Sequence, residues 1–191
     1  MSDTVRTGSR LDPWVGSYAS RAHAMRASEI RALFAVASRP EVVSLAGGMP
    51  YVQALPIEML TDTVERLLRE RGPVALQYGS GQGDVTLREQ ILDVIGEVGI
   101  SAHPDDIVVT TGSQMALDLV TRVFCNPGDV VLVESPSYVG ALGVFRAYEC
   151  DVVHVAMDDQ GLETTALREA IAAVRASGRA IKLIYTIPSF H

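Results

Sequence analysis

The spacing of apolar residues changes along the chain, and the change predicts strands and helices in alternation. Residues 107–110 are β-branched and continuously apolar, as expected of a strand that is buried on both faces. Three further strands and three helices are predicted beyond it: strands at 130–133, 152–155 and 181–185, and helices at 113–124, 138–148 and 164–176. This alternation favours a mostly parallel sheet that is covered by helices.

Ahead of this alternation the pattern predicts helices. Residues 19–37 form a loosely amphipathic stretch, and residues 56–71 predict a second helix, with Gly72 and Pro73 at its end. Residues 42–45 are a short extended run. The first fifteen residues are polar and irregular, so we expect no regular element there.

Composition narrows the class of protein. The chain has 191 residues, enough for one ample domain, with 48% hydrophobic and 20% charged residues. Its formal net charge of -7 argues against a nucleic-acid-binding face. No run approaches the roughly 18 apolar residues of a membrane span, and no apolar export segment is visible, so a cytoplasmic location is predicted.

The cysteines and the lysine indicate no further chemistry. Cys125 and Cys150 form no C-x-x-C pair and have no histidine at metal-ligand spacing. We therefore expect reduced, half-buried thiols, with neither a metal site nor a disulfide framework. Lys182, the single lysine, is expected at an edge or on the surface.

The strongest local motif is Thr110-Thr111-Gly112-Ser113-Gln114, between a predicted strand and an amphipathic helix. A glycine there allows a tight turn, and the free N–H groups at the helix start form an anion site together with the helix dipole. The Ser113 hydroxyl adds a further donor for a phosphate. A plain strand-to-helix turn with a serine cap explains the same residues.

A second motif, Glu134-Ser135-Pro136-Ser137-Tyr138, follows the next strand. Ligands of open α/β sheets gather outside the carboxyl ends of the strands, where a tyrosine offers a flat face to an aromatic ring. A turn with a half-buried tyrosine is the alternative.

Two glycine-rich segments are candidates for contact with a ligand. Tyr78 begins a loop that runs to Gly83, and either Asp84 or Thr86 is expected to cap the helix that follows. The paired glycines Gly47 and Gly48 let a backbone pass close to a substrate, although they equally serve a simple chain reversal.

Taken in order, five motifs resemble those of fold type I aminotransferases, which use pyridoxal phosphate (PLP). They are S-L-A-G-G-M-P, A-L-Q-Y-G-S-G-Q-G, T-T-G-S-Q-M-A-L-D-L, N-P-G-D-V-V-L-V-E-S-P-S-Y and I-Y-T-I-P-S-F-H. The resemblance runs from about residue 27 to residue 191 and is strongest to the subgroup of 2-aminoadipate and kynurenine aminotransferases. It implies an α/β chain with the mostly parallel sheet of the large domain and an N-terminal helical arm.

The resemblance implies roles for five residues around PLP. Ser113 and Gln114, on the Gly112 turn, match the segment that binds the phosphate. Tyr138 matches the aromatic residue that stacks on the pyridine ring. Tyr78 matches a tyrosine that reaches the phosphate of the neighbouring subunit, which implies a homodimer.

The substrates implied are an α-amino acid and a 2-oxo acid. Gly47 and Gly48 match the stretch that passes beside the bound substrate. Arg26 lies in the N-terminal helical region that contacts the substrate side chain in the subgroup, and a solvated helix arginine is its alternative.

The resemblance also implies that the proton chemistry lies outside these residues. The family continues with N-P-T-G, an aspartate for the pyridine nitrogen, the Schiff-base lysine and an arginine for the α-carboxylate. No catalytic residue is therefore expected before His191, and a truncated large domain is predicted: residues 1–50 form an arm and part of the small domain, and residues 51–191 the first part of the PLP domain. By itself such a chain is expected to be poorly soluble or to need a partner.

Three other interpretations remain. One is a non-catalytic PLP-binding sensor domain like those of MocR-type regulators, which the lack of a preceding helix-turn-helix pattern disfavours. Another is an inactive PLP-binding fragment. A nucleotide-binding Rossmann protein is disfavoured because no G-x-G-x-x-G fingerprint is present.

Overall fold

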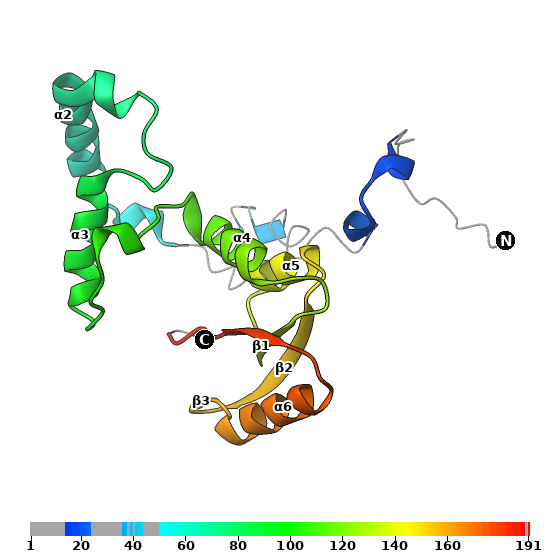
Figure 1. The fold of residues 1–191 in the computed structure, drawn as a ribbon. Helices are drawn as coiled ribbons and strands as arrows, with labels where there is room; N and C mark the ends of the chain where they lie inside the picture. The colour runs from blue at the N-terminus through cyan, green and yellow to red at the C-terminus, as the bar shows by residue number, and fades with distance from the viewer. Residues whose placement is uncertain (1–13, 24–35, 38, 40, 44–49, 190) are drawn as a thin grey trace. The chain divides into compact units, whose positions relative to one another are not determined.

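The computed structural model describes residues 14–23, 36–37, 39, 41–43, 50–189 and 191. The chain divides into two compact units, one of residues 29–112 and one of residues 113–191 together with residues 1–28 (Figure 1). Each unit is described by itself. Most of the helix predicted at 19–37 lies outside the described residues, and η2 (Ser20–His23) is a 3₁₀ turn at its start.

The unit of residues 113–191 is built on a four-stranded sheet. Its strands are β1 (Val130–Ser135), β2 (Asp151–Asp158), β3 (Gly161–Leu162) and β4 (Ile181–Tyr185), in the order β3-β2-β1-β4. The central strand β1 runs parallel to both β2 and β4, as the alternation predicted. The short strand β3 is antiparallel to β2 and was not predicted.

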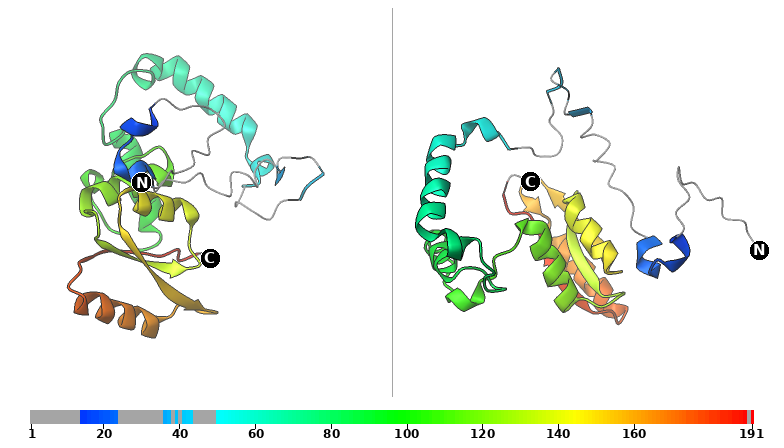
Figure 2. Two further views of the ribbon diagram at one scale, coloured as in Figure 1. Left: turned by 90° about the vertical axis from the view of Figure 1, so that its right-hand side faces the viewer. Right: turned by 90° about the horizontal axis from the view of Figure 1, so that it is seen from above.

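Helices cover both faces of this sheet. On one face lie α4 (Gly112–Phe124) and α5 (Val139–Ala147), and on the other lies α6 (Thr164–Ala176) (Figures 1 and 2). Val131 and Val133 of β1 pack with Phe145 of α5, whereas Val130 and Leu132 pack on the α6 side. These four β1 side chains are fully buried, so the core lies on both sides of one strand.

The pairing of β4 with β1 contains a one-residue register shift. Val130 pairs with Ile181 but Val131 pairs with Leu183, so Lys182 is passed over. Ile181 consequently packs on the α6 side and Leu183 on the Phe145 side, although residues two apart in a regular strand share a face. Lys182 is 38% exposed, as expected for a surface residue, and its Nζ lies 3.9 Å from Asp129 Oδ2.

The unit of residues 29–112 contains α2 (Ile57–Ala75), α3 (Val85–Gly96) and the 3₁₀ turns η3 (Val52–Ala54) and η4 (Pro104–Asp106). Asp84, rather than Thr86, caps α3, because its Oδ1 accepts from the Leu87 N–H at 3.1 Å. The buried Arg88 of α3 donates to the Pro104 carbonyl at 2.7 Å and to Asp105 Oδ1 at 3.2 Å. This guanidinium therefore fastens η4 to α3.

One sequence prediction in this unit holds and another is wrong. The helix predicted over residues 56–71 breaks at Arg71, whose φ is -133°, and a further helical turn continues α2 across this kink to Ala75. Pro73 fits because it stands in the first turn after the kink, where a missing N–H breaks no bond. Residues 107–110 form no strand, since no described strand pairs with them, and Val108 is 52% exposed.

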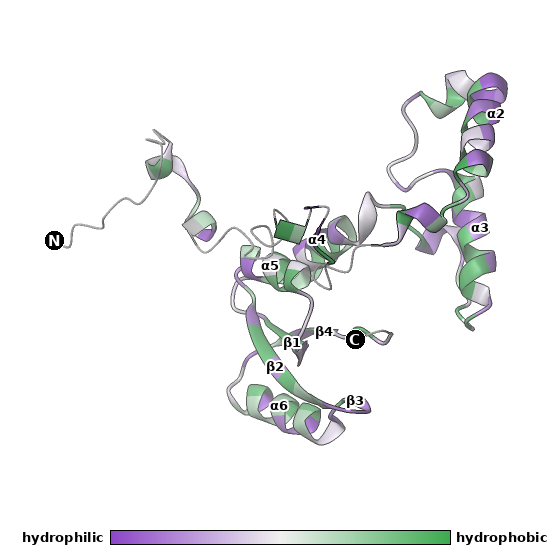
Figure 3. Cartoon of the chain, turned by 180° about the vertical axis from the view of Figure 1, so that it is seen from behind, coloured by the Kyte–Doolittle hydropathy of each residue, from purple (hydrophilic) through white to green (hydrophobic). Residues whose placement is uncertain are grey.

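Apolar side chains remain exposed along both α2 and α3. Hydrophobic and hydrophilic residues are interspersed along these helices (Figure 3). The exposed apolar residues are Ile57, Met59, Leu60, Val64, Leu67, Leu68, Val74, Val85, Leu87 and Val94. Within the residues that the structure describes, no helix has the length and apolarity needed to cross a membrane.

Gly83 holds the loop before α3 against residue 109. The Val109 N–H donates to the Gln82 carbonyl at 2.8 Å, and a Cβ at Gly83 would lie 2.6 Å from Val109 Cγ2. Gly83 also has a φ of +103°, which side chains rarely adopt. We predict that Gly83→Ala lowers the free energy of unfolding of the full-length protein by about 2 kcal/mol, measured by urea denaturation.

Gly81→Ala is the matched control, because nothing lies within 4 Å of a Cβ at that position in the same loop. It should change the unfolding free energy by less than about 0.5 kcal/mol. Equal effects of the two substitutions would show that the contact with Val109 is unimportant.

Cys125 and Cys150 are both free thiols, half-buried and buried respectively. Burial, followed by the neighbouring Cys125, raises the pKa of Cys150 to about 12, and burial also raises the pKa of Cys125. The folded state favours the protonated thiol. The contribution of Cys150 to the free energy of unfolding is therefore fully present below its unfolded-state pKa near 9 and is lost as pH rises toward 12.

Alkylation measures this shift directly. In the folded protein, we expect the rate at which iodoacetamide modifies Cys150 to keep rising with pH above 9, because the thiolate fraction is still increasing. In urea the rate should level off near the ordinary thiol pKa. Mass spectrometry of the Cys150 peptide gives both rates, and a plateau near pH 9 in the folded state would contradict the shift.

Candidate functional site

The start of α4 has the local geometry of an anion site. Gly112, the first residue of the helix, has a φ of +76°, and no atom would lie within 4 Å of a Cβ there. The Thr110 hydroxyl donates to the Gly112 carbonyl at 3.0 Å, which fixes the turn. Ser113 is exposed in this first turn, where backbone N–H groups have no partner within the helix.

Gln114 connects the start of α4 to the start of α5. Its Nε2 donates to the Gly140 carbonyl at 3.1 Å. Tyr138 is the N-cap residue of α5, and it remains 46% exposed although it follows a buried strand. The structure therefore brings the Ser113-Gln114 segment and the Tyr138 segment together at one edge of the sheet.

Ser137, between β1 and α5, has a hydroxyl that is available for a hydrogen bond. Its Oγ is buried and has no hydrogen-bond partner among the described residues. A buried polar atom without a partner is uncommon, because leaving it unpaired costs about 1–3 kcal/mol. This end of the sheet therefore has an unused hydrogen-bonding group beside Tyr138.

Glu134 is the residue of this site to which sequence reasoning assigned no role. Only 3% of it is exposed, and Oε2 accepts from the Ile187 N–H at 2.8 Å while Oε1 accepts from the Thr186 hydroxyl. The His191 Nε2 lies 3.9 Å from Glu134 Oε2 and 2.9 Å from the Pro136 carbonyl. A charged residue at the end of an apolar strand was the signal, because a buried carboxylate requires partners.

Tyr185, at the end of β4, packs into the same region. Its ring meets Phe145 edge to face, with centroids 5.8 Å apart. Burial raises the pKa of Tyr185, and the neighbouring Tyr138 and Glu134 raise it further. Its hydroxyl therefore stays protonated, as a donor, at neutral pH.

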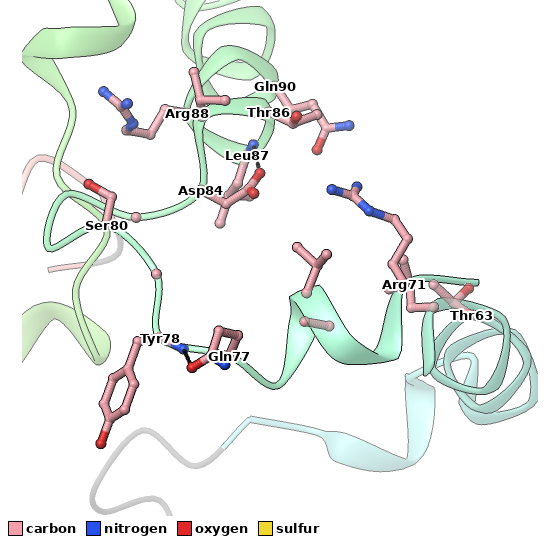
Figure 4. Close-up of a pocket in the computed structure, with 16 residues that line it drawn as sticks. Thr63, Arg71, Gln77, Tyr78, Ser80, Asp84, Thr86, Leu87, Arg88 and Gln90 are labelled. Atoms are coloured by element: carbon pink, nitrogen blue, oxygen red, sulfur yellow. Dashed lines mark hydrogen bonds between the residues drawn. The ribbon is translucent and has the colours of Figure 1, made fainter. Parts of the chain in front are cut away.

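Tyr78 belongs to the other unit and is fully exposed. It stands on the rim of an open hollow of about 800 Å³ between α2 and α3, lined among others by Arg71, Asp84 and Arg88. Its ring points away from the labelled residues of α3, and its backbone N–H donates to Gln77 Oε1 at 2.8 Å (Figure 4).

The remaining predicted site residues, Gly47, Gly48 and Arg26, lie outside the described residues. Within the described ranges, no group of three or more histidine, cysteine, aspartate or glutamate residues could hold a metal ion.

Comparison with known proteins identifies the family of this chain. The family profile "Aminotransferase class I and II" matches residues 40–187, most of the chain. The chain belongs to the class I and II aminotransferases. Its fold is accordingly the N-terminal part of the PLP-dependent fold type I, with the α/β sheet described above.

Individual relatives agree with this assignment. The chain is 38% identical over 174 residues to aromatic-amino-acid aminotransferase 1 of Thermococcus litoralis, a match that covers 91% of this chain and 42% of the relative. It therefore spans well under half the length of this curated relative.

Solved structures agree as well. The kynurenine aminotransferase of Pyrococcus horikoshii, determined with PMP and kynurenine, has a TM-score of 0.82 at 38% identity, covering 91% of this chain and 43% of that one. The alpha-aminoadipate aminotransferase of Thermus thermophilus, complexed with N-(5'-phosphopyridoxyl)-L-leucine, has a TM-score of 0.79 at 36% identity, covering 93% and 42%.

The anchoring role of Glu134 can be tested by Glu134→Gln. The amide can still accept from the Ile187 N–H and can donate to the Thr186 hydroxyl, but the negative charge that strengthens both hydrogen bonds is lost. We predict that the unfolding free energy of the full-length protein falls by about 1.5–3 kcal/mol in urea denaturation. Glu169→Gln, on the exposed side of α6, should change it by less than about 0.5 kcal/mol. A Glu134→Gln variant as stable as the wild type would show that the carboxylate is not an anchor.

Proposed function

We propose that the protein transfers an amino group from an α-amino acid to a 2-oxo acid with PLP as its cofactor. In this proposal, the residues of this chain supply the contacts to the phosphate and to one face of the ring. The observation that carries the proposal is the meeting of the α4 start with the Tyr138 segment through the Gln114–Gly140 hydrogen bond. Family membership and the phosphopyridoxyl group bound by the Thermus relative support it.

The residues at this edge of the sheet fit such a cofactor. A phosphate suits the N–H groups of the α4 start, where Gly112 leaves the backbone uncovered and Ser113 adds a hydroxyl. The exposed ring of Tyr138 provides a surface for an aromatic ring, and the buried Ser137 hydroxyl offers a hydrogen bond. When bound, PLP supplies an electron sink for the amino transfer.

Within this proposal, the residues divide the work. Gly112, Ser113 and Gln114 hold the phosphate, and Tyr138 orients the ring. The exposed Tyr78 reaches the phosphate site of a second subunit, which makes the working protein a homodimer. The placement of Gly47, Gly48 and Arg26 beside the substrate stays a prediction, as do the boundary at residue 50 and the cytoplasmic location.

Removing the Ser113 hydroxyl tests the phosphate site. For the full-length protein freed of cofactor, we predict that Ser113→Ala weakens PLP binding roughly tenfold in equilibrium dialysis, because one hydrogen bond to a charged group is lost. Thr165→Ala is the matched control: Thr165 is the second residue of α6, a helix as long as α4 on the opposite face of the sheet.

The control should bind PLP like the wild type. Addition of an amino acid to the PLP-loaded wild type should change its visible absorbance, and a 2-oxo acid should reverse the change. A wild-type protein that does not bind PLP would overturn the proposed function. Equal affinities of Ser113→Ala and the wild type would remove Ser113 from the phosphate site.

A further inference from the structure

The ring of Tyr138 occupies the space that a side chain at position 140 would need. A Cβ at Gly140 would lie 2.5 Å from Tyr138 Cε1 and Cζ and 2.6 Å from its hydroxyl oxygen. Such distances are far below van der Waals contact, so the ring and a side chain at 140 exclude one another. The tyrosine thus lies across the first turn of α5.

Gly140 differs in this respect from the other glycine of the same helix. Gly143, one turn further along α5, has no atom within 4 Å of its Cβ position. Glycine lowers the stability of a helix interior relative to alanine, so neither position favours glycine by helix propensity. The ring of Tyr138 supplies a reason for glycine at 140, and no contact supplies one at 143.

Gly140 makes a second contact, which joins the start of α5 to the start of α4. Its carbonyl accepts the hydrogen bond from Gln114 Nε2 at 3.1 Å. Gly140 therefore leaves room for the Tyr138 ring because it has no side chain. Its backbone carbonyl at the same time holds the start of α4. The side-chain amide of Gln114 is engaged in this contact, which leaves its backbone N–H for an anion.

We propose that Gly140 is a positioning residue for the cofactor: it sets the Tyr138 ring against α5 at a fixed distance from the Ser113-Gln114 turn. This inference rests on the proposed function. A side chain at 140 forces the ring to rotate off the helix, so the ring no longer meets the cofactor in a preset orientation. A preset ring loses less rotamer freedom on binding, and this raises affinity.

The first test is PLP affinity of the full-length protein, measured by equilibrium dialysis after removal of cofactor. Gly140→Ala should weaken PLP binding about tenfold, the size of one lost aromatic contact. Gly143→Ala should bind PLP like the wild type. Thermal unfolding is followed in parallel to establish that each variant is folded.

The second test distinguishes positioning from a general structural effect. In a Tyr138→Ala background the clash at 140 is absent, so adding Gly140→Ala should change the PLP affinity less than twofold. This background also keeps the test available if Gly140→Ala alone does not fold.

Wild-type affinity in Gly140→Ala, or the same loss in both backgrounds, would overturn the inference while leaving PLP binding by the wild type intact. A wild type that fails to bind PLP would instead overturn the proposed function and this inference with it.

Discussion

Four consecutive side chains of β1, Val130 to Val133, are fully buried, two on each face of the sheet. Each contributes roughly 1.5–3 kcal/mol through the apolar surface it removes from water. Strands β2 and β4 pair with β1 on either side, and the helices on both faces pack against it. The positions of Glu134, Ser137 and Tyr138 consequently depend on where β1 ends and on the contacts made at that end.

The residues at the carboxyl end of β1 are polar. The apolar strand passes directly into Glu134, which holds the backbone after β4, and then into the turn that carries Ser137 and Tyr138. The buried carboxylate keeps the ends of β1 and β4 together, and the Gln114–Gly140 bond keeps α4 beside them. The proposed cofactor contacts come from a rigid sheet edge, which suits a site that has to present groups in fixed positions.

The sequence predicted the elements of this unit well because their periodicity and their burial agree. The helix at 164–176 and the strand at 181–185 have the predicted bounds. Residues 107–110 failed because an apolar, β-branched run forms a strand only where a partner strand is present. The motifs singled out Ser113, Gln114 and Tyr138, whereas the role proposed for Gly140 depends on a contact with Tyr138 that no local pattern contains.

The register shift in β4 has a consequence for the length of the chain at this point. Lys182 is passed over in the pairing, and the apolar residues around it already follow the alternation of β1: Ile181 faces α6, while Leu183 and Tyr185 face Phe145. Deleting Lys182 would leave each of them opposite its present partner in an unbroken ladder. Deleting Leu183 instead would place Lys182 opposite Val131, on the buried face that packs against Phe145. Position 182 is therefore where this strand can shorten by one residue without losing its place in the core.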